Sequence, residues 1–207
     1  MVIRNNGIEL DAVVHSPSTD RGVLLLHPHP LYGGNMENEV VEKLEDLFVS
    51  EGITTCKMDF RGAGTSIGPY QGPRGAVADA IGAYEYMSDK LDLSSVGVLG
   101  YSFGGSIALA TANRLHPMFL VALSASKQIF LDAGASLADL SSVTCPALLC
   151  HGLDDAVVPV ADLDCISSSF RRRVETLKLE REGHFYLQSL DLVREEVRAF
   201  VREIWNQ

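Results

Sequence analysis

The pentapeptide Gly-Tyr-Ser-Phe-Gly at residues 100–104 is the segment of this sequence best suited to chemistry. An apolar run precedes it and an alanine-rich run follows it, so we expect a sharp turn from a strand into a helix. The glycines leave room for backbone that passes close by. The turn would hold the hydroxyl of Ser102 at the helix N-terminus, where free N–H groups favour developing negative charge. The alternative is a glycine-rich junction whose serine has no chemical role.

A serine hydroxyl is a weak nucleophile at neutral pH and needs a base that takes its proton. Of the six histidines, we select His184, which follows the last predicted strand in a loop from which it can reach Ser102. The alternative for His184 is an ordinary surface histidine. His116 stands at the end of a predicted helix, where we expect it to cap the helix. His151 ends a buried strand, where we expect it to pack or to hydrogen-bond.

An imidazole base needs an acceptor that fixes its tautomer and stabilises its cation. Asp154 and Asp155 both come directly after a predicted strand, and only one of them can face His184. Glu182 is a further candidate, but it lies only two residues before the histidine, and we expect it to point away. The residues by themselves leave the choice between the two aspartates open.

The elements that must position these residues alternate along the chain. Apolar or alternating runs predict strands, and apolar residues at helical spacing predict helices. The predicted strands are residues 8–15, 22–27, 53–60, 96–101, 119–124, 146–151 and 174–180, and the predicted helices are 38–48, 76–91, 105–115, 159–170 and 190–205. This order predicts an α/β fold with a mostly parallel central sheet and helices on both faces. In such sheets, ligands bind at the carboxyl ends of the strands.

The composition is that of a globular protein. The chain has 207 residues, 46% of them apolar, which predicts one domain over residues 1–207 with a large core. The net charge of −10 argues against binding to nucleic acid or to an anionic membrane surface. The sequence shows no signal peptide, no membrane-spanning run and no Cys-x-x-Cys pair, which predicts a cytoplasmic protein with reduced thiols. We expect a monomer or a homodimer.

Two segments are superficially similar to binding motifs. The glycines of residues 59–68 miss the dinucleotide-binding spacing Gly-x-Gly-x-x-Gly by one residue. We expect Asp59 or Arg61 of this segment to form a buried hydrogen-bond network instead. His27 and His29 share one face of a strand, but no carboxylate or cysteine accompanies them nearby. The sequence therefore predicts neither a cofactor nor a metal.

Serine, aspartate and histidine in this chain order are typical of α/β-hydrolases. The chain resembles a small member of that superfamily without a cap domain, similar to serine esterases of the dienelactone hydrolase type, over nearly its whole length. Four blocks carry the resemblance: residues 27–34 (HPHPLYGG), residues 59–66 (DFRGAGTS), residues 100–104 (GYSFG) and the pair of Asp155 and His184. The first block is specific to a subgroup known mainly as predicted hydrolases. The resemblance therefore implies the fold and the reaction type, with Asp155 as the acid, and leaves the substrate open.

The resemblance also implies an oxyanion hole, which is a pair of N–H groups that bind the negative oxygen of the reaction intermediate. The residue after the nucleophile, Phe103, supplies one N–H group. The loop after the strand at 22–27 supplies the other. Pro30 has no N–H group, which leaves His29, Leu31 or Tyr32, and we favour Leu31.

Residues 127–144 are too few to form the large helical lid that many of these hydrolases carry, so we expect an open site. Ile129, Phe130 and Leu131 either line an apolar acyl pocket or pack as a flap onto the rest of the chain. The sequence predicts a serine hydrolase of small-molecule carboxylic esters that works through an acyl-enzyme.

Three alternatives stay open for the function. A thioesterase or peptidase would use the same triad. A small-molecule binder would use the same fold without catalysis. A dienelactone-type hydrolase usually has a cysteine nucleophile, which the serine at position 102 disfavours.

Overall fold

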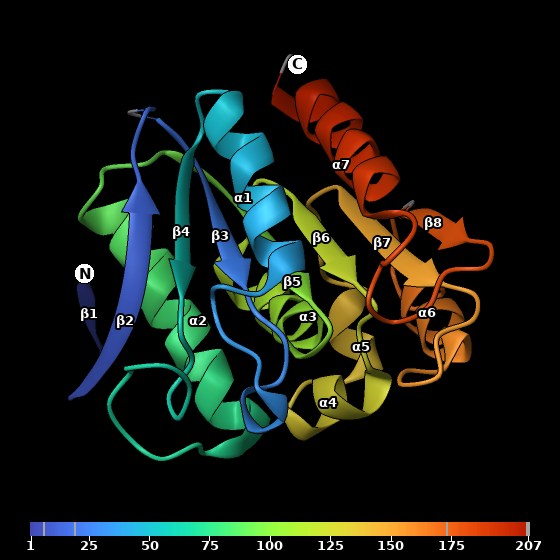
Figure 1. Cartoon of the computed structure of the whole chain (residues 1–207), viewed down its shortest axis with the longest axis horizontal. Helices are drawn as coiled ribbons and strands as arrows, with labels where there is room; N and C mark the ends of the chain where they lie inside the picture. The colour runs from blue at the N-terminus through green and yellow to red at the C-terminus, as the bar shows by residue number, and fades with distance from the viewer. Residues whose placement is uncertain (6, 19, 173, 206–207) are drawn as a thin grey trace.

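The computed structural model describes residues 1–5, 7–18, 20–172 and 174–205. Its centre is an eight-stranded sheet in the order β1-β2-β4-β3-β5-β6-β7-β8 (Figure 1). β2 runs antiparallel to both of its neighbours, and all other adjacent strands are parallel. The strands are β1 (Val2–Asn5), β2 (Ile8–His15), β3 (Arg21–Leu26), β4 (Thr54–Met58), β5 (Ser95–Tyr101), β6 (Leu120–Leu123), β7 (Ala147–Gly152) and β8 (Glu175–Leu179).

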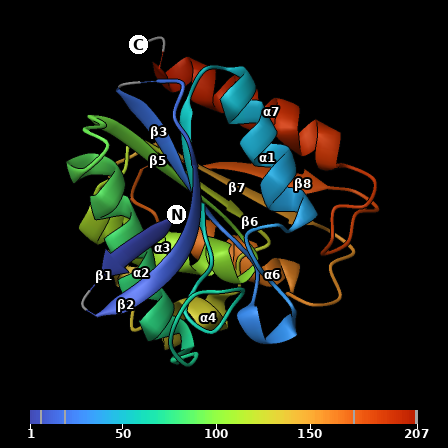
Figure 2. The same cartoon turned by 60° about the vertical axis from the view of Figure 1, so that its left-hand side comes forward.

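Helices cover both faces of the sheet, which confirms the predicted fold class. On one face lie α1 (Glu39–Ser50) and α7 (Leu190–Trp205), side by side in both views (Figures 1 and 2). On the other face lie α2 (Gly72–Asp89), α3 (Phe103–Leu115) and α6 (Val160–Ser167). The shorter helices are η1 (Pro30–Tyr32), α4 (Lys127–Asp132) and α5 (Leu137–Leu140).

The central strands are apolar throughout because helices cover both of their sides. Consecutive side chains point to opposite faces, so Val98 of β5 packs in the core under α2 and α3, while Leu99 packs in the core under α1 and α7. Full burial of one such side chain contributes about 1.5–3 kcal/mol to stability. The two cores hold β5 firmly at the centre of the sheet, and β5 leads directly into the pentapeptide at residues 100–104.

The outer helices follow simple sequence signals. In α1, the side chain of Asn38 accepts a hydrogen bond of 3.1 Å from the N–H of Val40 and caps the first turn. In α7, Val193, Val197 and Phe200 recur at helical spacing and are buried against the sheet. The predicted bounds of α7 match those of the structure, since this amphipathic stripe marks the helix along its whole length.

Two of the differences from the prediction concern α2 and β1. α2 begins at Gly72, four residues earlier than expected, because Pro73 fits the first turn of a helix, where its missing N–H group has no partner to lose. β1 was not predicted, since it is a strand of only four residues at the edge of the sheet. In the described part of the chain, no helix is long and apolar enough to cross a bilayer.

The segment expected to form a flap folds into α4 and α5. Phe130 is fully buried in the core beside α2 and α3, and Ile129 packs partly against the same core. Leu131 is exposed. The two expectations for this segment were an apolar acyl pocket and a flap that packs onto the rest of the chain. The structure shows the packed flap, because Phe130 is buried in the core and cannot line a pocket.

Candidate active site

The carboxyl edge is the edge of the sheet at which the parallel strands β3 to β8 end, and it gathers the residues selected from the sequence. Ser102 follows β5, Asp155 lies in the loop after β7, and His184 lies in the loop after β8. The arrowheads of these strands point to this edge in Figure 1. Parallel strands thus bring together side chains that are far apart along the chain.

The backbone at Ser102 is strained. The residue has φ 55° and ψ −113°, a conformation that a side chain disfavours. A Cβ atom on Gly100 would lie 2.1 Å from the carbonyl oxygen of Gly104, and one on Gly104 would lie 2.1 Å from that of Leu26. Both glycines are therefore required by close backbone contacts, as the pentapeptide predicts.

Hydrogen bonds hold the strained turn in place. The N–H of Ser102 donates to the carbonyl of Leu123 in β6 at 2.7 Å. Its own carbonyl accepts bonds from the N–H and the hydroxyl of Ser106, at 3.0 and 3.1 Å. The hydroxyl of Ser106 also accepts a bond from the N–H of Ser126 at 2.9 Å. The turn is thereby tied to β6 and to the start of α4.

A hydrogen-bonded chain joins the three side chains. Nε2 of His184 lies 2.9 Å from Oγ of Ser102, and Nδ1 lies 2.7 Å from Oδ2 of Asp155. Because an ionised carboxylate can only accept, Nδ1 carries the proton and Nε2 is left to accept from the serine hydroxyl. Ser102 is 9% exposed and His184 is 6% exposed. The arrangement can remove the proton of the serine hydroxyl.

The environment of Asp155 keeps it ionised. Its Oδ1 accepts bonds of 2.8 Å from the N–H groups of Val157 and Val158. Burial would raise the pKa of Asp155, but the hydrogen bonds from Val158, His184 and Val157 outweigh it and lower the pKa. The neighbouring Asp154 is exposed and makes no side-chain contact with the histidine among the described interactions.

Several side chains that the sequence analysis did not select hold the loop of His184. The hydroxyl of Tyr101 donates to the carbonyl of His184 at 2.9 Å. The buried Tyr186 places its hydroxyl 2.9 Å from that of Ser124 and donates to the carbonyl of Cys150 at 3.2 Å. In the sequence, only their position could have indicated these tyrosines, because each lies within two residues of a selected residue.

Glu182 and His151 take structural positions around the site. The carboxylate of Glu182 accepts bonds from three N–H groups of its own loop, those of Gly183, Gln188 and Ser189. It thus points away from the imidazole, as expected. Nε2 of the buried His151 lies 3.0 Å from the carbonyl of Val158 and 3.4 Å from Oδ2 of Asp155. His151 thus contacts the loop that carries Asp155.

One of the two N–H groups expected to act as donors near Ser102 is already engaged in a hydrogen bond. Phe103 is the first residue of α3, so its N–H group has no partner one turn back in the helix. Leu31 donates its N–H to Nδ1 of His29 at 3.2 Å, and Tyr32 donates its N–H to the carbonyl of His29 at 3.1 Å. Among the described contacts, the N–H of His29 has no such partner. The N–H of Leu31, expected as a donor, is therefore already engaged.

Buried polar contacts lie beneath the loops at this edge. Nδ1 of His27 donates to the carbonyl of Pro28 at 2.6 Å, and Nε2 accepts from the N–H of Phe60 at 3.0 Å. Burial lowers the pKa of His27 to about 4, so the ring is neutral. Arg61 pairs with the buried Asp79 through Nη2 at 2.5 Å. These bonds fasten the loop after β4 to the loop after β3 and to α2.

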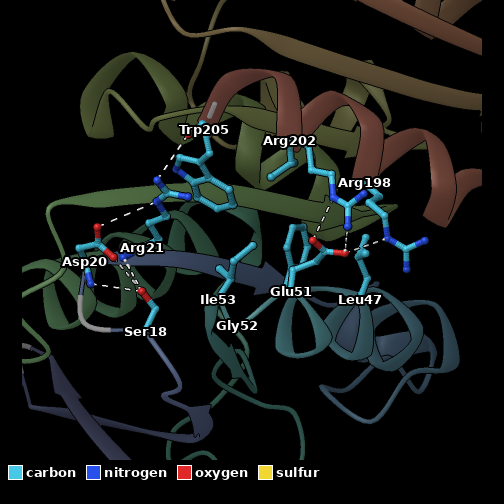
Figure 3. Close-up of a pocket in the computed structure, with 12 residues that line it drawn as sticks. Ser18, Asp20, Arg21, Leu47, Glu51, Gly52, Ile53, Arg198, Arg202 and Trp205 are labelled. Atoms are coloured by element: carbon cyan, nitrogen blue, oxygen red, sulfur yellow. Dashed lines mark hydrogen bonds and ion pairs between the residues drawn. The ribbon is translucent and has the colours of Figure 1, made fainter. Parts of the chain in front are cut away.

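A separate cavity lies at the amino edge of the sheet, opposite to the carboxyl edge. Its volume is about 590 Å³, and it lies between the C-terminal ends of α1 and α7 and the start of β3. Figure 3 shows Glu51 facing Arg198 and Arg202, and Arg21 beside Trp205. The cavity is remote from Ser102. Among the described residues, no group of three or more histidine, cysteine, aspartate or glutamate side chains is placed to hold a metal.

Sequence comparison places these residues in a known family. The sequence model of the dienelactone hydrolase family matches residues 65–184, which include Ser102, Asp155 and His184. An uncharacterized protein of Rickettsia prowazekii is 30% identical over 158 residues, or 76% of this chain. The match spans 66% of the length of that relative.

Solved structures share the whole architecture. An alpha-beta serine hydrolase homologue from Coxiella burnetii is 25% identical, with 98% of this chain and 95% of that chain covered and a TM-score of 0.83. A serine hydrolase without a lid from Xanthomonas campestris is 24% identical, with 98% and 93% covered and a TM-score of 0.83. Est1E from Butyrivibrio proteoclasticus, with bound ferulic acid, is 17% identical, with 100% of both chains covered and a TM-score of 0.90. The chain has the α/β-hydrolase fold.

Proposed function

This chain belongs to the dienelactone hydrolase family, and we propose that it is a serine hydrolase that cleaves carboxylic esters through an acyl-enzyme. The observation that carries the proposal is the chain of two hydrogen bonds from Ser102 through His184 to Asp155, at 2.9 and 2.7 Å. Its position at the carboxyl ends of parallel strands, on a strained turn at a helix N-terminus, supports the same function.

In the proposed mechanism, Nε2 of His184 takes the proton of Ser102 as Oγ attacks the carbonyl carbon of the ester. The tetrahedral intermediate then expels the alcohol, which receives this proton from the imidazolium. A water molecule, deprotonated by the same nitrogen, attacks the acyl-enzyme and releases the acid and the free serine. Asp155 holds the imidazole in the required tautomer and stabilises its cation.

The negative oxygen of the intermediate needs N–H donors on the other side of the reacting carbon. We assign one to Phe103 at the N-terminus of α3. We assign the second to His29, in place of Leu31, because the Leu31 N–H already donates to the His29 ring. One such donor typically contributes about 3–4 kcal/mol to stabilisation of the transition state.

The test is the hydrolysis of p-nitrophenyl butyrate by the wild-type chain and by Ser102→Ala. We expect kcat/KM to fall by a factor of about 10³–10⁶ in the variant, because the nucleophile is lost. A fluorophosphonate probe should label Ser102 in the wild type and should not label the variant. Equal turnover by both proteins, or a wild type that the probe does not label, would contradict the proposal.

The leaving group needs a second measurement, because a thioesterase or a peptidase would use the same three side chains. A panel with one acyl group as ester, thioester and anilide separates these activities. The proposal expects the highest kcat/KM for the ester.

A further inference from the structure

Exposed apolar side chains gather at the carboxyl edge. Most of the exposed large apolar side chains of the described residues lie in loops that follow the parallel strands there, among them Leu31, Tyr32, Leu153, Val157, Phe185 and Leu187. Large apolar groups in contact with water are unfavourable, and a group of them on one surface marks a binding site. The loops of this edge therefore present a surface that suits an apolar ligand.

Two exposed aromatic rings lie beside residues of the proposed mechanism, Tyr32 beside His29 and Phe185 beside His184. The ring of Tyr32, which is 88% exposed, lies 4.9 Å from the ring of His29, and that ring lies 4.7 Å from the ring of Phe103. Tyr32 is thus adjacent to the residues that offer N–H donors.

The ring of Phe185, which is 63% exposed, lies 5.5 Å from the ring of His184 at an angle of 89°. It stands on the side of the base. Val157 adds a third exposed apolar group, and its N–H is bound to Asp155. Each of these side chains is one contact away from a residue of the proposed mechanism.

We propose, on the basis of the proposed function, that Tyr32 and Phe185 bind the substrate, and that the site takes neutral esters with an apolar or aromatic group on each side of the scissile bond. The two rings match such a molecule because one lies beside the oxyanion donors and the other beside the base. The net charge of −10 disfavours a substrate that carries a carboxylate. The surface is open, so substrate groups should be covered in part.

Partial burial of the acyl chain on this surface sets the expected change in kcat/KM. Full burial of a methylene group improves binding roughly fourfold, so half-burial on an open surface should give about twofold per methylene. From acetate to hexanoate, the acyl chain gains four methylene groups. The value of kcat/KM should therefore rise about 16-fold along this series.

The experiment measures kcat/KM for p-nitrophenyl acetate, butyrate and hexanoate, all below the concentration at which they aggregate. The variants are Tyr32→Ser and Phe185→Ser. The matched control is Leu192→Ser in α7, which removes a side chain that is 49% exposed away from these loops. We expect the hexanoate-to-acetate ratio to fall about threefold in each of the two variants and to stay unchanged in the control. Thermal melting checks that all variants are folded.

A second arm tests charge. The monoanionic p-nitrophenyl hemisuccinate has about the size of the neutral pentanoate ester, and its kcat/KM should be at least about tenfold lower. A benzyl ester should also be a better substrate than the ethyl ester of the same acid, because an aromatic alcohol group meets an exposed ring.

Other outcomes would overturn the inference. They are a flat acyl series in the wild type, variants that behave like Leu192→Ser, or a preference for the hemisuccinate. If the fluorophosphonate probe still labels Ser102 when one of these outcomes is found, only this inference fails and the proposed function stands. A wild type that neither reacts with the probe nor cleaves acetate overturns both proposals.

Discussion

The two edges of the sheet differ in where they keep their polar and apolar groups. At the carboxyl edge, Ser102 and His184 are buried, while Tyr32 and Phe185 are exposed. The amino edge has the usual arrangement, in which the charged side chains around its cavity pair at the surface above a buried apolar floor. Buried polar groups beside a group of exposed large apolar side chains are the less common arrangement. The inversion supports the proposal that the carboxyl edge carries the active site, although the amino edge has a cavity of about 590 Å³.

The same difference holds for the polar groups themselves. At the amino edge, Glu51 accepts bonds of 2.8 and 3.0 Å from Arg202 and pairs with Arg198 at 3.2 Å. These charges already have partners. At the carboxyl edge, the N–H group of Phe103 has no partner one turn back in its helix, and it follows the strained backbone of Ser102. Strain together with available polar groups is typical of sites that act on a ligand.

The largest contrast between the edges should follow from Asp155→Asn. The amide cannot hold His184 in the required tautomer, so we expect kcat for p-nitrophenyl butyrate to fall about 10³–10⁴-fold in a protein that still unfolds cooperatively. The matched control is Asp154→Asn, which changes an exposed carboxylate one residue away and should leave kcat unchanged. Similar losses in both variants would remove Asp155 from the mechanism.

Next in size is the effect of a single methyl group on backbone packing. Gly100→Ala places a carbon 2.1 Å from the carbonyl oxygen of Gly104, and we expect it to lower the free energy of unfolding by about 3 kcal/mol or more. Gly52→Ala at the amino edge meets nothing within 4 Å and has only the strain of φ +73°, about 1 kcal/mol. Urea unfolding compares the two variants. Equal losses in the free energy of unfolding would mean that the turn at Ser102 accommodates the added methyl group without a further loss of stability.

A lower pH should reduce the free energy of unfolding through His27, which is buried beneath the loops of the carboxyl edge. The pKa of His27 is about 4 in the folded protein and 6.5 when exposed, so between these values the unfolded chain binds a proton that the folded chain does not. His27 therefore contributes stability that is complete above pH 6.5 and lost as the pH falls to about 4. The loss at pH 5 should be about 2 kcal/mol.

Urea unfolding at pH 7 and pH 5 measures this loss, and His27→Gln should reduce it, whereas His116→Gln, at an exposed helix end, should not. NMR titration of the imidazole gives an independent value if the His27 variant fails to fold. A His27 resonance that titrates near the ordinary value for histidine would contradict the prediction.

The smallest effect should come from the amino edge. Glu51→Gln removes ion pairs at the protein surface, and we expect a change in the free energy of unfolding of less than about 1 kcal/mol, with kcat unchanged. Added salt should reduce the difference further, because ions screen surface charges. A loss of esterase activity in this variant would show that the two edges are coupled.

Patterns along the chain predicted most of the fold. The amphipathic stripe of α7 and the apolar runs of the central strands are local signals, so these elements were found within a few residues. β1 has four residues and forms by pairing with β2, a contact that no local pattern records. The single domain, the cytoplasmic location and the monomeric or dimeric state stay predictions.

The site was predictable to the extent that it follows from topology. Ser102 was selected from its pentapeptide, and His184 was selected because a loop after the last predicted strand lies at the same edge of the sheet. The hydrogen bond from Tyr101 to the carbonyl of His184 joins residues 83 positions apart and depends on how two loops meet in space. The donor expected from Leu31 depends on the orientation of the His29 ring, which no spacing of residues reveals.

Because the chain is synthesised from its N-terminus, the distance in sequence between Ser102 and His184 has a further consequence. Ser102 is joined to a base that follows 82 residues later, after the last strand of the sheet. Ribosomes add about 5–20 residues per second, so the serine is made roughly 4–16 s before its base. Throughout that interval the nascent polypeptide holds a nucleophile that nothing activates. Under the proposed mechanism, newly made protein becomes able to cleave esters only when translation has passed β8 and this strand has docked.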